Sequence, residues 1–170
     1  MSSDRPAQSA QAQAETPAEA RTPPEGTVAA TPSTKPEPKL ELPANPAAGK
    51  IGTRDFTYDT ATLEGGWLTL RQGADFFADA EIKVTLFESD QKKLGGKTIT
   101  VAPGARGMFP HVRASSQQNG QTQTTTLTSG YTMTLHFDPF EGDKVRGSID
   151  LKLPGKPGAT VKGNFIARVK

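Results

Sequence analysis

Between Tyr131 and Lys170 the chain alternates apolar and polar residues over three successive runs. The odd positions of these runs hold apolar residues or glycine, and the even positions hold polar residues with the exception of Ile166. Because successive side chains of a β-strand point to opposite faces, this period of two predicts three strands that each bury one face. The separating segments DPFEGD (138–143) and PGKPG (154–158) are rich in turn-forming residues. We therefore expect an antiparallel meander. The side chains that it should bury together include Leu135, Ile149, Leu151 and Phe165.

Earlier segments show the same alternation, which predicts strands at residues 51–58, 67–71, 80–86 and 97–101. The whole pattern gives about eight or nine strands and contains no convincing helix of about ten residues. We therefore predict an all-β fold, an antiparallel β-sandwich, with a partly open β-barrel as the alternative.

Asn119-Gly120 predicts a tight hairpin turn, because both residues readily adopt the positive φ that such a turn requires. The arms on either side, RASSQQ (113–118) and QTQTTT (121–126), are polar at odd and even positions alike. Arms without an apolar face do not cover a core. We expect either a finger that projects into solvent or a loop whose strands do not pair.

The first fifty residues contain nine of the fourteen prolines and no Phe, Tyr or Trp. Such a segment buries too little apolar surface to offset the entropy that ordering would cost. We expect residues 1–49 to be a disordered Pro/Ala-rich tether and residues 50–170 to form the antiparallel β-sandwich domain.

Charge and cysteine content exclude several kinds of site. Residues 51–170 carry fifteen Lys and Arg against twelve Asp and Glu, an excess too small to indicate nucleic-acid binding. The chain has no cysteine and no apolar run long enough to span a membrane. Neither His111 nor His136 lies in a spacing typical of a metal site or a catalytic triad. We therefore predict no catalytic residue, no metal site and no cofactor.

Three carboxylates, those of Asp138, Glu141 and Asp143, lie close together in the sequence between two predicted strands. Oxygen ligands of this kind bind calcium, but the spacing differs from that of an EF-hand and is also ordinary for a turn. The sequence leaves calcium binding at this loop open.

In its layout the chain resembles bacterial envelope proteins that carry one β-domain on a Pro/Ala-rich tether, such as mature lipoproteins. The resemblance implies a periplasmic or cell-surface location, with a cytoplasmic protein as the alternative, and a possible lipid anchor upstream of residue 1. The partner would be a protein or glycan of the cell envelope, and the protein a monomer without a membrane span. The function that we expect is that of a non-enzymatic binding or scaffolding module.

Two other functions remain open. One is a hydrolase or enzyme-inhibitor domain whose site lies on loops 103–130. The other is a structural subunit that assembles through an edge strand of its sheet.

The candidate contact residues come from the polar hairpin and from the only tryptophan of the chain. Long polar loops on a rigid scaffold are often functional, and their amide groups make adaptable hydrogen bonds. A tryptophan on the polar side of a strand is a common anchor for sugars and protein partners. The predicted binding residues are Trp67, Arg113, Gln118, Asn119 and Gln121.

Overall fold

A computed structural model describes residues 42–73, 77–105, 107–156 and 158–170 of the chain. Most of the predicted tether, residues 1–41, lies outside the described residues. Its last residues are described and belong to the β domain, since Ala47 is buried and the first strand begins at Ala48. The domain therefore begins before the predicted boundary at residue 50.

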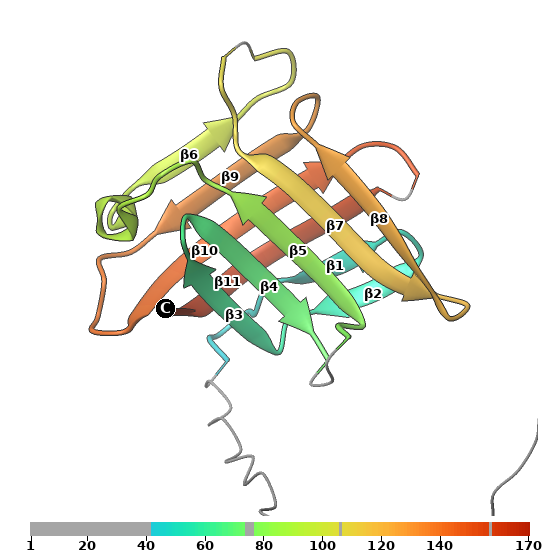
Figure 1. The fold of residues 1–170 in the computed structure, drawn as a ribbon, viewed down its shortest axis with the longest axis horizontal. Coiled ribbons are helices and arrows are strands. Elements are labelled where there is room, and N and C mark those ends of the chain that lie inside the picture. Colours follow the sequence, from blue (N-terminus) through green and yellow to red (C-terminus); the bar gives the residue numbers. More distant parts are fainter. Residues whose placement is uncertain (1–41, 74–76, 106, 157) are drawn as a thin grey trace, which may run out of the picture. The chain divides into compact units, whose positions relative to one another are not determined.

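The described residues form eleven strands and one 3-10 turn, η1 (Gln91–Leu94). Figure 1 shows their arrangement. In chain order the strands are β1 (Ala48–Ile51), β2 (Arg54–Thr57), β3 (Thr60–Glu64), β4 (Trp67–Gln72), β5 (Ala80–Thr85), β6 (Thr98–Val101), β7 (His111–Gln118), β8 (Gln121–Leu127), β9 (Thr132–Phe137), β10 (Lys144–Leu153) and β11 (Ala159–Val169).

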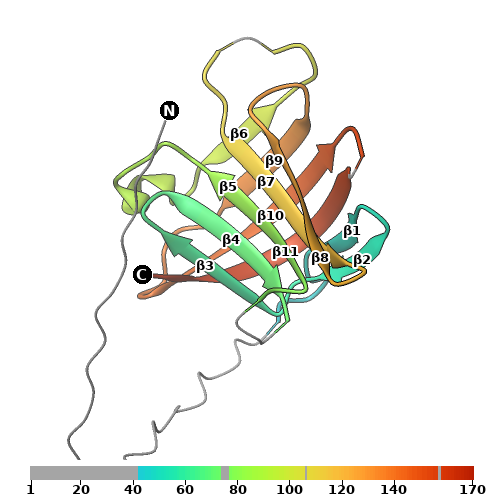
Figure 2. The same cartoon turned by 45° about the vertical axis from the view of Figure 1, so that its right-hand side comes forward.

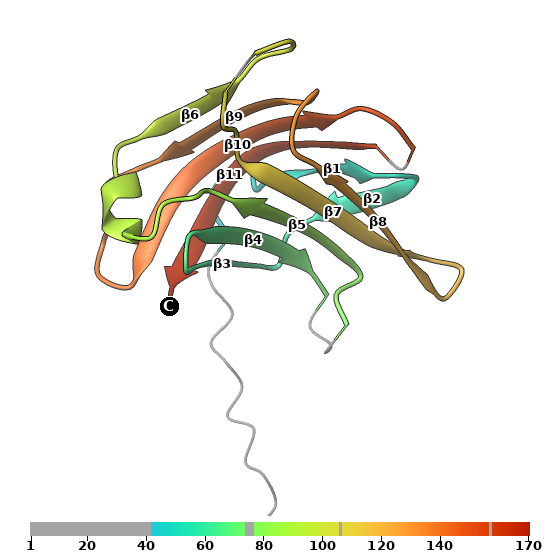
Figure 3. The same ribbon diagram turned by 45° about the horizontal axis from the view of Figure 1, so that its top comes forward.

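Nine strands form one continuous path in the order β6-β9-β10-β11-β3-β4-β5-β7-β8, and the β1–β2 hairpin joins β11 beside that path. The paired strands are antiparallel except β11 and β3, which run parallel. The sheet curls into a half-barrel, so β9–β11 and β3–β5–β7 face one another, as Figures 2 and 3 show. The all-β prediction is confirmed, and the single curled sheet has the form of the partly open barrel.

The concave face of the sheet holds the core, and the predicted meander supplies much of it. β9, β10 and β11 pair antiparallel, and Leu135, Ile149, Leu151 and Phe165 are all buried, as predicted. Gly147 provides space for the ring of Phe165, because a Cβ at this glycine would lie 2.6 Å from the Cζ atom of Phe165. In this meander the alternation of the sequence therefore predicts the inner and outer faces of the sheet correctly.

One edge of β11 is shared by several segments. β1 pairs with residues 159–162, and the backbone of residues 45 and 47 exchanges hydrogen bonds with Asn164. The Tyr58 hydroxyl then accepts a hydrogen bond from the Ile166 N–H at 3.1 Å. β3 pairs with the last two residues, Arg168 and Val169. The parallel β11–β3 contact is therefore short, and a side-chain hydroxyl bonds a backbone group of β11 next to it.

Two expectations from the sequence are corrected. Residues 51–58 do not form one strand, because Gly52 adopts a φ of 62° and the chain turns back between β1 and β2. β3, which the sequence analysis did not predict, then follows Tyr58. Its short TATLE sequence contains only two apolar inward residues, Ala61 and Leu63, and its start carries no strong turn signal.

The polar hairpin is also not a free finger or an unpaired loop. β7 pairs with the whole of β5, and its Val112, Ala114 and Ser116 side chains are buried. The sequence misled because alanine and serine do not mark a buried face, yet their small size suits the crowded inner surface. The turn, much of β8 and the outward-facing His111 and Arg113 of β7 remain exposed.

Among the described residues, no helix is long and apolar enough to cross a membrane.

We predict that Gly163→Ala destabilises the domain far more than Gly96→Ala does. Both glycines have positive φ, but the 72° of Gly96 lies close to the left-handed region that alanine can adopt at modest cost, whereas the 136° of Gly163 is adopted almost only by glycine. At Gly163 the new Cβ would also lie 2.7 Å from the Pro46 carbonyl oxygen, whereas Gly96 has no neighbouring atom within 4 Å. The additional backbone clash should cost about 1–3 kcal/mol, measured by urea unfolding of both variants. Equal losses would show that residues 45–47 do not pack against β11 in this way.

We also predict that the domain loses stability as the pH rises above about 10. Burial raises the pKa of Tyr58, against an opposing effect of the Ile166 N–H, and burial raises the pKa of Tyr131 as well. The folded state then keeps protons that the unfolded state releases, so the free energy of unfolding falls through this range.

The test compares wild type with the Tyr58→Phe/Tyr131→Phe double variant by urea unfolding between about pH 8 and pH 11. The double variant should be less stable at pH 8, because each buried hydroxyl makes a hydrogen bond, to Ile166 and to the Pro110 carbonyl oxygen. Its deficit should narrow above about pH 10. A constant deficit at all pH values would contradict the prediction.

Candidate functional site

Two large aromatic side chains lie on the outer, water-facing side of the sheet. Trp67 at the start of β4 is 45% exposed, and Phe87 just after β5 is 52% exposed. Both follow the alternation of their strands on the polar side, since their neighbours Leu68 and Leu86 are buried. Aromatic side chains that are exposed to solvent to this extent are typical of contact surfaces.

Basic side chains surround these rings. The Lys83 ammonium lies 4.0 Å from the centroid of the Trp67 ring, a cation–π distance. Arg113 of β7 stands directly opposite Lys83 in the strand register. His111 meets the ring of Phe87 edge-on, with 4.7 Å between centroids and 89° between planes. We call these five residues the aromatic–cationic patch: Trp67, Lys83, Phe87, His111 and Arg113.

The backbone fixes Phe87 in its exposed position. Its φ of 55° lies in the left-handed region, which is rare for a bulky residue and is found where surrounding structure enforces it. The Leu86 N–H donates to the Gly66 carbonyl oxygen at 2.8 Å, and a Cβ on Gly66 would lie 2.6 Å from the Glu88 carbonyl oxygen. The β3–β4 turn therefore holds residues 86–88 so closely that the ring of Phe87 is directed outward.

The patch can bind a ligand that combines flat apolar faces with negative charge. Its rings offer stacking surfaces, Arg113 offers an exposed positive charge, and the half-buried Lys83 adds a second one beside the Trp67 ring. Two carboxylates border it in the strand register, Glu64 opposite Trp67 and Glu81 opposite Arg71. Glu81 lies on β5 two residues from Lys83, so an acidic side chain accompanies the basic ones on this part of the outer face.

The remaining predicted contact residues lie at the hairpin tip. Gln118 and Gln121 are the last and first residues of β7 and β8, and Asn119 forms the turn with a φ of 51°. Gln118 also lines an open cleft of about 770 Å³ between the tip, the β1–β2 turn and the β10–β11 loop. Lys50, Thr53, Gln123 and Thr160 contribute polar groups to the same cleft.

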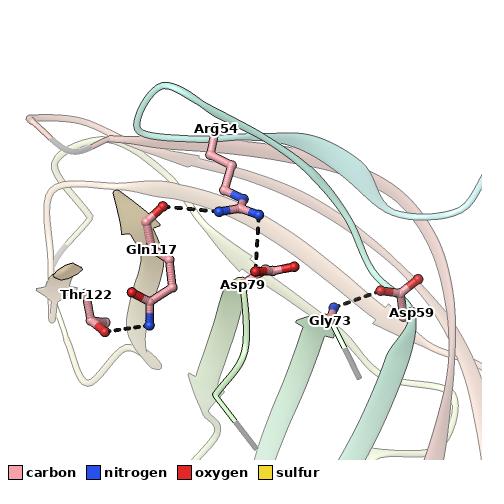
Figure 4. A network of polar contacts seen from close by, with 6 residues as sticks. All are labelled: Arg54, Asp59, Gly73, Asp79, Gln117 and Thr122. Atoms are coloured by element: carbon pink, nitrogen blue, oxygen red, sulfur yellow. Dashed lines mark hydrogen bonds and ion pairs between the residues drawn. The ribbon is translucent and has the colours of Figure 1, made fainter. Parts of the chain in front are cut away.

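A polar network holds the end of this hairpin, as Figure 4 shows. The Arg54 guanidinium donates to the Gln117 carbonyl oxygen at 3.2 Å and pairs with the Asp79 carboxylate at 3.2 Å. The Gln117 N–H donates to the Asp79 carbonyl oxygen, and the Gln117 side chain donates to the Thr122 hydroxyl at 2.9 Å. The tip is therefore tied to β2 and to the residue before β5.

The structure thus divides the predicted contact residues into two groups. Trp67 and Arg113 lie on either side of Lys83, whereas Gln118, Asn119 and Gln121 lie about 17 Å further along the hairpin from Arg113. Sequence reasoning missed Lys83, Phe87 and His111. The position of Phe87 on the polar side of an alternating strand was the available signal.

A second cluster lies on the other half of the sheet. The Thr98 hydroxyl is 2.8 Å from Nδ1 of His136, and Nε2 of His136 is 3.2 Å from the Asp138 carboxylate. If the imidazole is neutral, an ionised Asp138 can only accept a hydrogen bond, so Nε2 would carry the proton and Nδ1 would accept from Thr98. This chain of groups can withdraw a proton from a hydroxyl.

The surroundings of this cluster are less suited to catalysis. His136 and Asp138 line a cleft of about 350 Å³ together with Arg146, Ser148 and Asn164, but Thr98 does not line it. The side chains of His136 and Asp138 are 40% and 48% exposed, so water weakens the electrostatic interactions between them.

Two basic side chains of β10 and β11 have acidic partners. Lys162 binds Asp150 at 2.8 Å, which raises the pKa of Lys162, and Arg146 pairs with Glu141 at 3.6 Å. Glu141 and Asp138 thus have other partners, and among the described residues no three acidic or histidine side chains are placed to hold a metal ion. The geometry gives no support to calcium binding by Asp138, Glu141 and Asp143.

Comparison of the chain with protein-family models, with curated proteins and with solved structures finds no match in any of the three.

Proposed function

We propose that the β domain is a non-enzymatic binding module whose contact surface is the aromatic–cationic patch. The ligand that fits it best is an anionic glycan. Sugar rings stack on exposed aromatic faces, and the carboxylate or phosphate groups of such a polymer pair with lysine and arginine.

The observation that carries this proposal is the exposed Phe87 at a left-handed φ beside Trp67 and its cationic neighbours. A residue held in a strained conformation needs support from its surroundings, and here that support keeps a large apolar ring in water. The ring of Phe87 is not part of the buried core, and a partner bound at this surface would remove it from water.

The proposal places this module in the periplasm or at the cell surface, where anionic glycans occur. The composition of residues 1–49 supports this location, because the segment is rich in proline and alanine and resembles a tether. A tether of this kind would let the patch reach a ligand at some distance from an anchoring surface. An acidic protein of the envelope is the second partner that the same charges and rings would fit.

The chain contains one tryptophan, so its fluorescence reports on the patch directly. We predict that titration with polygalacturonate, an acidic polysaccharide, changes the Trp67 emission, whereas neutral dextran does not. The Lys83→Gln/Arg113→Gln double variant should bind at least about tenfold more weakly at low salt, because two phosphate- or carboxylate-pairing charges are lost. Rising salt should weaken binding by wild type.

The matched control is Lys152→Gln, which removes an exposed lysine from β10 in the opposite half of the sheet. Its affinity should remain within about twofold of wild type, because exposed charges beyond about 10 Å are screened. An equal effect of the control, or no change of Trp67 emission with either polymer, would refute the patch as a glycan site.

The hydrogen-bonded chain Thr98–His136–Asp138 favours a second candidate function, that of a weak hydrolase. Thr98, His136 and Asp138 lie outside loops 103–130, where the sequence analysis expected a hydrolase site. In this function Thr98 would attack an ester carbonyl while His136 accepts the hydroxyl proton and Asp138 orients the imidazole.

Hydrolysis of p-nitrophenyl acetate separates the two functions. If the cluster is catalytic, Thr98→Ala and His136→Ala each reduce the rate by about 100-fold or more. His111→Ala, which removes the other histidine of the chain, should leave it unchanged. Equal background rates in wild type and all three variants, which we expect, would exclude this candidate.

A further inference from the structure

The curled sheet ends in two edge strands, β6 and β8, and they differ in how they are protected. β6 spans only four residues and lies between Lys97 and Pro103. Short length, lysine and proline are devices by which natural proteins prevent edge-to-edge pairing. β8 spans seven residues, QTQTTTL, and has no charged residue or proline within it or next to it in the sequence. Among the described residues, the one charged residue that pairs with it is Arg113 of β7, opposite Thr126 and on the side away from the free edge.

The register of the hairpin shows which backbone groups β8 presents to solvent. The turn at Asn119-Gly120 is closed by the pair Gln118–Gln121, and hydrogen-bonded pairs recur at every second residue from there. The N–H and C=O groups of Thr122, Thr124 and Thr126 therefore point away from β7. In the part of the chain that the structure describes, β7 is the only strand paired with β8.

Charge makes this edge complementary to itself. From Ala114 to Phe137 the chain contains no Asp, Glu, Lys or Arg. Two copies of β8 can therefore approach without repulsion between like charges. Threonine has a high preference for strands, and Thr–Thr pairs across strands are favourable.

We propose that two copies of this protein associate through antiparallel pairing of their β8 strands about a two-fold axis at Thr124. In this register Thr124 faces Thr124 of the second copy, and Thr122 faces Thr126 on either side. Each of these three pairs can exchange two backbone hydrogen bonds, about six in all. The pairing closes on itself, and the protection of β6 prevents its extension into a filament.

The dimer is weak and reversible. A strand pair of this length falls within the class of small interfaces, below about 1,200 Å². It therefore forms at high local concentration, and a monomer is expected in dilute solution. The two-fold axis runs perpendicular to the sheet, so the outer faces of the two copies, each with its aromatic–cationic patch, are directed to the same side.

Single-cysteine variants of the full chain test the register, because the chain has no cysteine of its own. The pairing brings the two Thr124 Cα atoms about 5.5 Å apart, within the range of a disulfide. Thr124→Cys should therefore form a covalent dimer under mild oxidation with copper–phenanthroline. A mixture of Thr122→Cys and Thr126→Cys should form the mixed dimer.

Thr126→Cys alone is the matched control, since it lies on the same face of the same exposed strand. Its two copies would be offset by four residues, about 13 Å, which is too far for a disulfide. Thr124→Lys, with folding checked by circular dichroism, should abolish the concentration-dependent association that sedimentation equilibrium detects in wild type. The proposal is overturned if Thr126→Cys cross-links as fast as Thr124→Cys, or if wild type and Thr124→Lys sediment identically at about millimolar concentration.

Discussion

The fold depends on how the long edge of β11 is satisfied. This strand of eleven residues faces β1 at its start, the backbone of residues 45–47 in the middle, and β3 only at its end. No single strand could follow it, because the sheet must curl sharply here to place β3–β5 opposite β9–β11. The Tyr58 hydroxyl bonds the Ile166 N–H in the gap before β3. Gly163 leaves space for the backbone that crosses beside it. This arrangement connects β11 to β3 and so joins the two halves of the curled sheet.

The curl also gives the two faces of the sheet different side chains. The inner face is filled with aliphatic and aromatic side chains, so binding groups are restricted to the outer face and the rims. On the outer face, neighbouring strands bring Trp67, Lys83 and Arg113 into one row although they are far apart in the sequence. A rigid sheet holds such groups without the entropy that a loop would lose on binding. In the function that we propose, the patch would need little reorganisation on binding.

Alternation predicted the parts of the fold in which inside and outside differ strongly, such as the meander of β9, β10 and β11. It failed where side chains are small or polar but still buried, as at Ala114 and Ser116, because size rather than polarity suits them to the inner face. It also could not reveal the turn at Gly52, since one glycine within an apolar run is a weak signal. The sequence analysis identified Trp67 and Arg113 as contact residues. It could not show that Lys83 lies between them, because this depends on the register of neighbouring strands. Pairing between distant strands cannot be derived from one sequence.

The hydrogen bonds of residues 44–47 have a mechanical consequence. The Ala47 N–H, the Asn164 N–H and the Asn164 side chain connect this short segment to β11 through three bonds. Tension that reaches the domain along the residues before Leu42 would load this segment before any other part of the sheet. Force would first strip residues 44–47 and β1 from β11, while the meander and its core carry load only afterwards. Under such tension the attachment of β1 would therefore separate first, while the patch on β4–β7 would keep its structure.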